Sequence, residues 1–219
     1  MDTQVIIDRL QRFLLKLDTS VFEEMRDDAT ATIPALIVAV VSFLLFGLGG
    51  WFWWLAEGYG DGGKLFWQSV LLGSVFAIAL WAVWIGIAYV LLVNLFHYTA
   101  DVQRMFRACS FATIPLILGL LLFIPGINIG IGLAVLGIFF LLMDIGIQVS
   151  VDAQPGHVIV STFIGFLVFC LVLSLLVSRD NWLAPGVFLF RGPATITSDL
   201  ANAFNAVPRN FQIPTVTTR

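Results

Sequence analysis

The chain has 219 residues, of which 59% are hydrophobic and only 11% are charged, and its mean hydropathy is +0.98. Soluble domains carry roughly 25% charged residues, so a soluble protein of this composition could not cover its surface, and we expect it to lie in lipid. The formal net charge of −3 and the missing basic block argue against a nucleic-acid partner. The two cysteines, Cys109 and Cys170, stand far apart and form no metal-ligand pair.

Residues 1–32 are polar or amphipathic, without the early apolar core of a cleavable signal. Apolar residues here recur at the spacing of one helix face, and the charged ones lie largely on the other side. The apolar set is Ile6, Leu10, Phe13, Leu14, Leu17 and Val21, and the charged set is Asp8, Arg9, Arg12 and Lys16. We expect an amphipathic helix on the cytoplasmic leaflet, against a partner, or packed back on its own bundle. The acidic "EEMRDDATAT" that follows should cap the first span.

Five stretches are long and apolar enough to cross a bilayer, for which a helix needs about 20 residues. None alternates with period two, and an open sheet edge cannot lie in hydrocarbon, so strands are excluded. The sequence therefore predicts an all-α, polytopic membrane protein with a five-helix transmembrane domain over 33–178. The expected spans are roughly 33–55, 67–96, 108–124, 127–149 and 157–178. Pro115 lies within the third span, and Pro125 with Gly126 forms the turn into the fourth.

An odd number of spans places the two ends of the chain on opposite sides of the membrane. With the N-terminus in the cytoplasm, most basic residues before the tail fall there, as the positive-inside rule requires, and the short loops on the far side hold only Lys64. Those basic residues are Arg9, Arg12, Lys16, Arg26, Arg104 and Arg107. The same arrangement places a group of tryptophans at the far interface, where indole rings prefer to lie. That group is Trp51, Trp53, Trp54, Trp67 and Trp182.

The tail, residues 179–219, contains four prolines, and its apolar residues are scattered. Alone, such a segment should be largely mobile on the non-cytoplasmic side. We expect it to become ordered only against other subunits of a larger assembly.

Asp144 is a single carboxylate within the apolar run "FFLLMDIGIQV". It lies about 26 Å along the fourth span, near the cytoplasmic interface of a hydrocarbon core about 30 Å thick. We interpret it as an interfacial anchor that sets helix depth, with Arg104 and Arg107 as plausible partners. A proton or ion relay would need further ionisable groups at the membrane midplane, and the spans offer none.

His97 and His157, at the cytoplasmic ends of spans two and five, are weak candidates for binding a metal or a tetrapyrrole. Trp81 and Trp84 could line a pigment groove, but at their spacing simple helix packing is the favoured interpretation. No catalytic motif stands in the extramembrane segments, so we expect no enzyme activity and no cofactor. Glycines in spans one and four should allow helices to approach closely.

Two stretches resemble the Yip family of five-span membrane proteins, named for interacting with Rab-type GTPases, and in particular its bacterial branch. They are "VFEEMRDDATATIPALIVAVVSFLLFGLG" and "FRACSFATIPLILGLLLFIPGINIGIGLAVLGIFFLLMDIGIQV". Arg107, Pro115, Pro125 and Gly126 occupy places of the family pattern, and the resemblance covers roughly residues 20–178. The fourth span lacks the tryptophan often found mid-helix, and the tail is longer than the family needs. The resemblance implies a bacterial cytoplasmic-membrane protein without a catalytic constellation.

We therefore expect a non-catalytic accessory or scaffold subunit of a larger membrane complex, for example a respiratory or photosynthetic one. Its expected partners are other membrane protein subunits and lipids. The alternative is a free-standing membrane-organising or trafficking-type adaptor that works through its N-terminal helix. A small carrier and a pigment-binding subunit are weaker alternatives.

Overall fold

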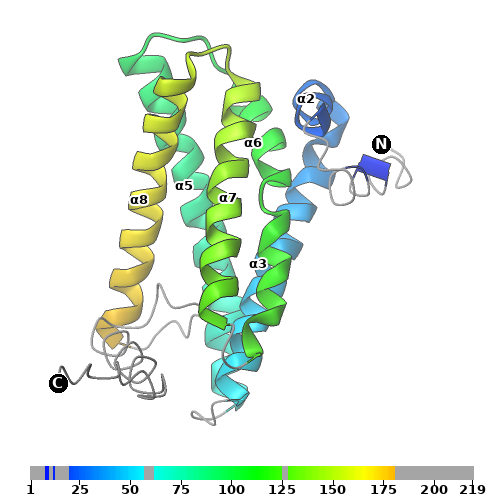
Figure 1. Ribbon diagram of the computed structural model, residues 1–219, viewed down its shortest axis with the longest axis vertical. Helices are drawn as coiled ribbons and strands as arrows, with labels where there is room; N and C mark the ends of the chain where they lie inside the picture. Colours follow the sequence, from blue (N-terminus) through cyan, green and yellow to red (C-terminus); the bar gives the residue numbers. More distant parts are fainter. Residues whose placement is uncertain (1–7, 10–11, 13–19, 57–61, 125–127, 181–219) are drawn as a thin grey trace, which may run out of the picture.

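The computed structural model describes residues 8–9, 12, 20–56, 62–124 and 128–180, and all regular structure among these residues is helical (Figure 1). Five of its helical stretches are long and apolar enough to cross a membrane. They are Ala29–Trp53, Gly62–Leu95, Val102–Phe123, Gly130–Ser150 and Pro155–Leu173. The predicted fold class, an all-α bundle of five spans, is confirmed.

Helix α2 (Ser20–Asp27) caps one end of the bundle and leads through the single turn η1 (Ala29–Ala31) into α3 (Thr32–Ala56) (Figure 1). Its side chains Val21, Phe22 and Met25 are fully buried, and the helix contacts α6 and α7. Of the apolar residues of the predicted N-terminal helix, Val21 alone lies within the described residues, so the placement of that helix stays a prediction. Residues 1–7, 10–11 and 13–19 lie outside the described residues.

Asp28 performs the capping role predicted for the acidic stretch. One of its carboxylate oxygens, Oδ1, accepts hydrogen bonds from the amide and the hydroxyl of Thr30, at 3.0 and 2.6 Å. An oxygen in this position satisfies one of the amides that have no partner within the helix at the entry to the first span.

The second span is built from four consecutive pieces. These are α4 (Gly62–Phe66), the π-helical η2 (Trp67–Gly73), α5 (Ser74–Val90) and the π-helical η3 (Leu91–Leu95). The helix ends where His97 adopts a left-handed backbone with φ of 60°. This conformation closes the last turn, since the amide of Tyr98 reaches the carbonyl of Leu92 at 2.9 Å.

The third span changes helix type at its middle. The α-helix α6 (Val102–Phe111) gives way to the 3₁₀ helix η4 (Ile114–Phe123). Pro115 has no amide hydrogen and cannot continue the α pattern, and the amide of Leu116 bonds to the carbonyl of Thr113 at 2.9 Å instead. Burial follows the threefold repeat that such a helix requires, because Leu116, Gly119 and Leu122 are buried.

The 3₁₀ segment also explains how a short apolar run crosses the membrane. Ten residues rise about 20 Å in a 3₁₀ helix but only about 15 Å in an α-helix. The structure begins this span at Val102 rather than at 108. A search for continuous apolar sequence misses this start, because the first turns of the helix carry polar side chains. The helix begins after Asp101, whose carboxylate accepts a hydrogen bond from the amide of Gln103 at 2.8 Å.

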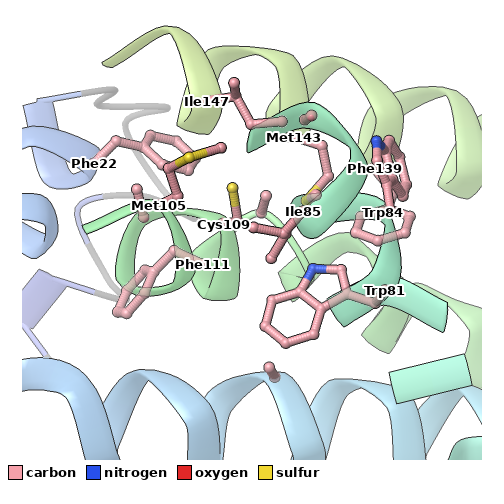
Figure 2. Packing of buried hydrophobic residues seen from close by; sticks show 14 of the residues in the cluster. Phe22, Trp81, Trp84, Ile85, Met105, Cys109, Phe111, Phe139, Met143 and Ile147 are labelled. Carbon is pink, nitrogen blue, oxygen red and sulfur yellow. The ribbon is translucent and has the colours of Figure 1, made fainter. Parts of the chain in front are cut away.

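Helices α7 (Asn128–Ser150) and α8 (Pro155–Asp180) complete the bundle, with α8 packed chiefly against α5 and the 3₁₀ helix η4 against α3 and α7 (Figure 1). Trp81 and Trp84 of α5 are buried among phenylalanines, the latter beside Phe139, Phe166 and Phe169. Figure 2 shows Trp81, Trp84 and Phe139 in one buried cluster with Phe22 and Met105. The packing interpretation of the two tryptophans therefore fits the structure.

Glycines allow the closest helix contacts in the first span, as expected, and also in the fifth, whereas a Cβ at Gly130 or Gly137 of the fourth span would meet no atom within 4 Å. A Cβ at Gly49 of α3 would fall on the carbonyl of Gly119 in η4, and a Cβ at Gly165 of α8 would fall on the ring of Trp84. Two hydroxyls tie α3 to the second span, because Ser69 and Ser74 donate to the carbonyls of Gly47 and Phe43 at 2.8 and 3.0 Å. Small residues and hydroxyl–carbonyl bonds are how helices associate where lipid surrounds them.

Gly49→Ala should lower the stability of the bundle, because a methyl group cannot share the space of a backbone carbonyl. We expect a loss of about 1–3 kcal/mol, typical of overpacking, measured as a lower melting temperature in detergent micelles. Gly86→Ala is the control, since a Cβ at Gly86 meets no atom within 4 Å. Equal melting temperatures for Gly49→Ala and Gly86→Ala would show that α3 and η4 do not approach this closely.

Candidate functional site

The end of the bundle that carries α2, which we call the α2 end, contains a buried guanidinium that has no carboxylate partner among the described residues. Arg107 of α6 is only 6% exposed. Its Nε and Nη2 donate to the main-chain carbonyl of Arg26 at 3.2 and 2.7 Å, and its Nη1 lies 3.4 Å from the hydroxyl of Thr32. One side chain thus joins α6 to α2 and to the start of α3.

Arg26 extends the same junction to α7. Its Nη1 donates to the carbonyl of Val149 at 2.9 Å, in the last turn of α7, where a cation also suits the helix dipole. Its other guanidinium nitrogens bind Asp27, and this hydrogen-bonded pairing holds the pKa of the Asp27 carboxyl below its usual value. The carbonyl of Arg26 therefore accepts hydrogen bonds from α6, and its side chain donates one to α7.

A second group of charges ties Arg9 and Arg12 to α2 and to Asp28 directly after it. Arg12 binds the Glu24 carboxylate through two nitrogens at 2.8 and 2.6 Å, and Arg9 binds both Glu24 and Asp28 at 3.1 Å. The hydrogen bond from Arg12 lowers the pKa of Glu24, and Arg9 adds to the effect. The hydrogen bonds from Thr30 and Arg9 likewise lower the pKa of Asp28.

The predicted partners of Asp144 are occupied elsewhere. Arg107 bonds as described above, and Arg104 is exposed and lies 3.9 Å from Asp101. The Oδ1 atom of Asp144 is buried and has no hydrogen-bond partner among the described residues. The polar side chain that faces the carboxyl is Thr162 of α8, which is fully buried and whose hydroxyl is the neighbouring donor. Sequence reasoning missed Thr162, because a hydroxyl in an apolar helix gives no signal on its own.

The two histidines lie in the loop region of the α2 end without forming a ligand set. His97 is exposed and terminates the second span. His157, at the start of α8, has its Nδ1 2.9 Å from the hydroxyl of Tyr98 and stacks on Phe96 with ring centroids 4.1 Å apart. Within the described part of the chain, no three His, Cys, Asp or Glu side chains gather as metal ligands.

At the opposite end of the bundle, the tryptophans predicted as anchors take different positions. Trp51 donates to the carbonyl of Gly62 at 2.9 Å and joins α3 to α4, whereas Trp67 is 63% exposed. Trp53 points inward and is 7% exposed. The side chain of Trp54 and the residues Pro125, Gly126 and Trp182 lie outside the described residues.

Taken together, the polar side chains of this site bind main-chain carbonyls and one another across helix ends. Such an arrangement fixes the relative positions of helices, and the fold defines a polytopic membrane protein of five spans. A family model for the Yip1 domain matches residues 15–178, so the chain belongs to the Yip family. Neither the curated proteins nor the solved structures compared with this chain gave a match.

Arg107→Met should destabilise the bundle by about 2–3 kcal/mol, because it removes the charged hydrogen bonds to the Arg26 carbonyl and the tie between α6 and α2. Arg104→Met, the same change one turn away on an exposed side chain, should cost less than about 0.5 kcal/mol. Thermal unfolding in detergent compares the two. If both variants melt alike, the buried guanidinium is not what holds this end together.

The bonds to Glu24 predict a pH-dependent contribution to stability. Because the folded-state pKa of Glu24 is lowered, its contribution is present above the unfolded-state pKa, about 4.3, and is lost as pH falls through the folded-state value. Wild type should therefore melt above Glu24→Gln at pH 7, and the difference should vanish towards pH 3. Glu23→Gln, beside it on α2, is the control and should shift the melting temperature little. A gap that stays constant down to pH 3 would contradict the pairing.

Proposed function

We propose that this chain is a non-catalytic accessory or scaffold subunit of a larger membrane protein complex. The supporting observation is the Arg26–Arg107 junction, in which both guanidinium groups donate hydrogen bonds to main-chain carbonyls of neighbouring helices. Polar groups used in this way fix the positions of helices and give the bundle a defined outer face. A defined face in the membrane suits the binding of other subunits.

The orientation that fits this role places the α2 end in the cytoplasm of a bacterial cell, with the tail 179–219 on the other side of the inner membrane. The basic residues of the α2 end support the orientation through the positive-inside bias. The tail would contact other subunits through its scattered apolar residues.

Family membership favours a second function, a free-standing membrane-organising or trafficking-type adaptor. That role requires the N-terminal helix to be available to a leaflet or a partner. Of the apolar residues of that helix, Val21 lies within the described residues and is buried against the bundle, so this end of the helix would have to undock first. For this reason we favour the scaffold role.

Purification in a mild detergent tests the proposal. The chain should migrate with a large complex, and replacing residues 179–219 by a Gly/Ser linker of equal length should release it from that complex, while the full-length chain stays bound. Migration of the full-length chain as a free monomer would contradict the scaffold role and favour the adaptor.

A further inference from the structure

Helices α3 and α8 lie on either side of the second span and are displaced from each other along it. Of the pieces of that span, α3 packs chiefly against η2, near its start, whereas α8 packs against α5 and also contacts η3, at its end. Figure 1 shows that α8 both begins and ends nearer the α2 end than α3 does. Contacts on each side fix the register, so the displacement can be counted in residues.

The register of α3 follows from the hydroxyl–carbonyl bonds to the second span. One of these bonds joins Ser74 to the carbonyl of Phe43. The two helices run in opposite directions, so a position six residues earlier on α3 lies level with one six residues later on α5. Ile37 of α3 therefore lies at about the height of Leu80 of α5.

The register of α8 follows from the ring of Trp84. The ring centroids of Phe166 and Phe169 lie 5.2 and 5.8 Å from that of Trp84, so this tryptophan is level with the stretch between them. Helix α8 also runs opposite to α5. Four residues beyond this level, Leu171 of α8 lies at about the height of Leu80.

Ile37 and Leu171 are thus level along the second span, yet they lie at different points of their own spans. Ile37 is eight residues from Ala29, where the first span begins, and Leu171 is sixteen residues from Pro155, where the fifth begins. The fifth span is therefore displaced towards the α2 end by eight residues, or about 12 Å at 1.5 Å per residue.

The apolar surface that faces lipid follows this displacement. The first exposed large apolar side chain is Ile33 in the first span and Ile159 in the fifth, each four residues from the start of its span. A flat hydrocarbon layer about 30 Å thick covers both surfaces evenly only if the bundle is inclined. Neighbouring helix axes lie about 8–10 Å apart, so a displacement of about 12 Å across two such distances corresponds to an inclination of about 30°.

The length of the second span has the same origin. It has 34 residues, or about 50 Å, whereas the other four spans have 19 to 25 residues. It begins beside the end of α3, where Trp51 donates to the carbonyl of Gly62, and it ends beside the start of α8, where Phe96 stacks on His157. The long span thus extends over both of its displaced neighbours.

We propose that the bundle crosses the bilayer obliquely, with the second span inclined by about 30° to the bilayer normal. The oblique belt of exposed apolar side chains, which begins at Ile33 on α3 and at Ile159 on α8, is its surface for acyl chains. Ile37 and Phe163, each eight residues into its span, then lie at one depth. The inference goes beyond the proposed function and concerns the chain by itself.

Spin-label depths in dioleoylphosphatidylcholine vesicles test the proposal. Single cysteines replace the exposed residues Ile37, Phe163 and Leu171 of the full-length chain, in which Cys109 and Cys170 are serine. Each carries a nitroxide, and collisions with dissolved oxygen and with a water-soluble nickel chelate give its depth. We expect equal depths at positions 37 and 163, with position 171 about 10 Å deeper. Equal depths at 37 and 171, with 163 about 12 Å nearer to water, would overturn the inference.

A local step in the bilayer surface would also bring positions 37 and 163 to one depth, so the inclination of α5 is measured as well. The chain is labelled with ¹⁵N-tryptophan in oriented bilayers, and solid-state NMR reports the directions of the amides of Trp81 and Trp84. Trp81→Phe and Trp84→Phe assign the two signals. An inclination of about 30° is expected, whereas an α5 within about 10° of the bilayer normal overturns the inference even where the depths agree.

Discussion

Hydrocarbon offers no hydrogen-bond partner, and this constraint explains the placement of nearly every polar group described here. Main-chain donors and acceptors are satisfied within helices, so the spans are helical. The bundle must also close its own helix ends, where carbonyls lack partners within the helix. Arg107 and Arg26 do so at the α2 end by donating to carbonyls, and Trp51 donates to the carbonyl of Gly62 at the other end. The charges at the α2 end thus act as structural ties between helices.

The same constraint determines how the helices approach one another. Without a hydrophobic force between apolar surfaces, close contact depends on small residues and on hydroxyl–carbonyl bonds. Gly49 against Gly119 and Ser74 against Phe43 are examples on α3. The 3₁₀ helix η4 belongs to this pattern, because its threefold repeat places Gly119 on the buried side between Leu116 and Leu122. Pro115 fixes the change of helix type, and the smaller radius lets α3 come close.

Hydropathy predicted the five spans and the all-α fold because crossing a membrane leaves a long apolar signal. It could not place the N-terminal helix, since an apolar stripe that runs from Ile6 to Val21 suits a leaflet and a bundle equally. From the sequence we expected Arg107 to be a partner of the Asp144 carboxylate. We therefore missed that Arg107 binds a main-chain carbonyl. Position within a helix also did not show that Trp53 points inward or that Thr162 faces Asp144, because these depend on how helices rotate against one another.

The central claim is that five helices cross the membrane, so that residues at the two ends of the bundle face opposite compartments. Single cysteines at the exposed positions Glu23, Asp101, Asp152 and Lys64, in a chain with Cys109 and Cys170 replaced by serine, test it in sealed vesicles with a membrane-impermeant thiol reagent. We predict that positions 23, 101 and 152 react from one side and position 64 from the other. Labelling of position 64 from the same side as position 23 would contradict the five-span arrangement.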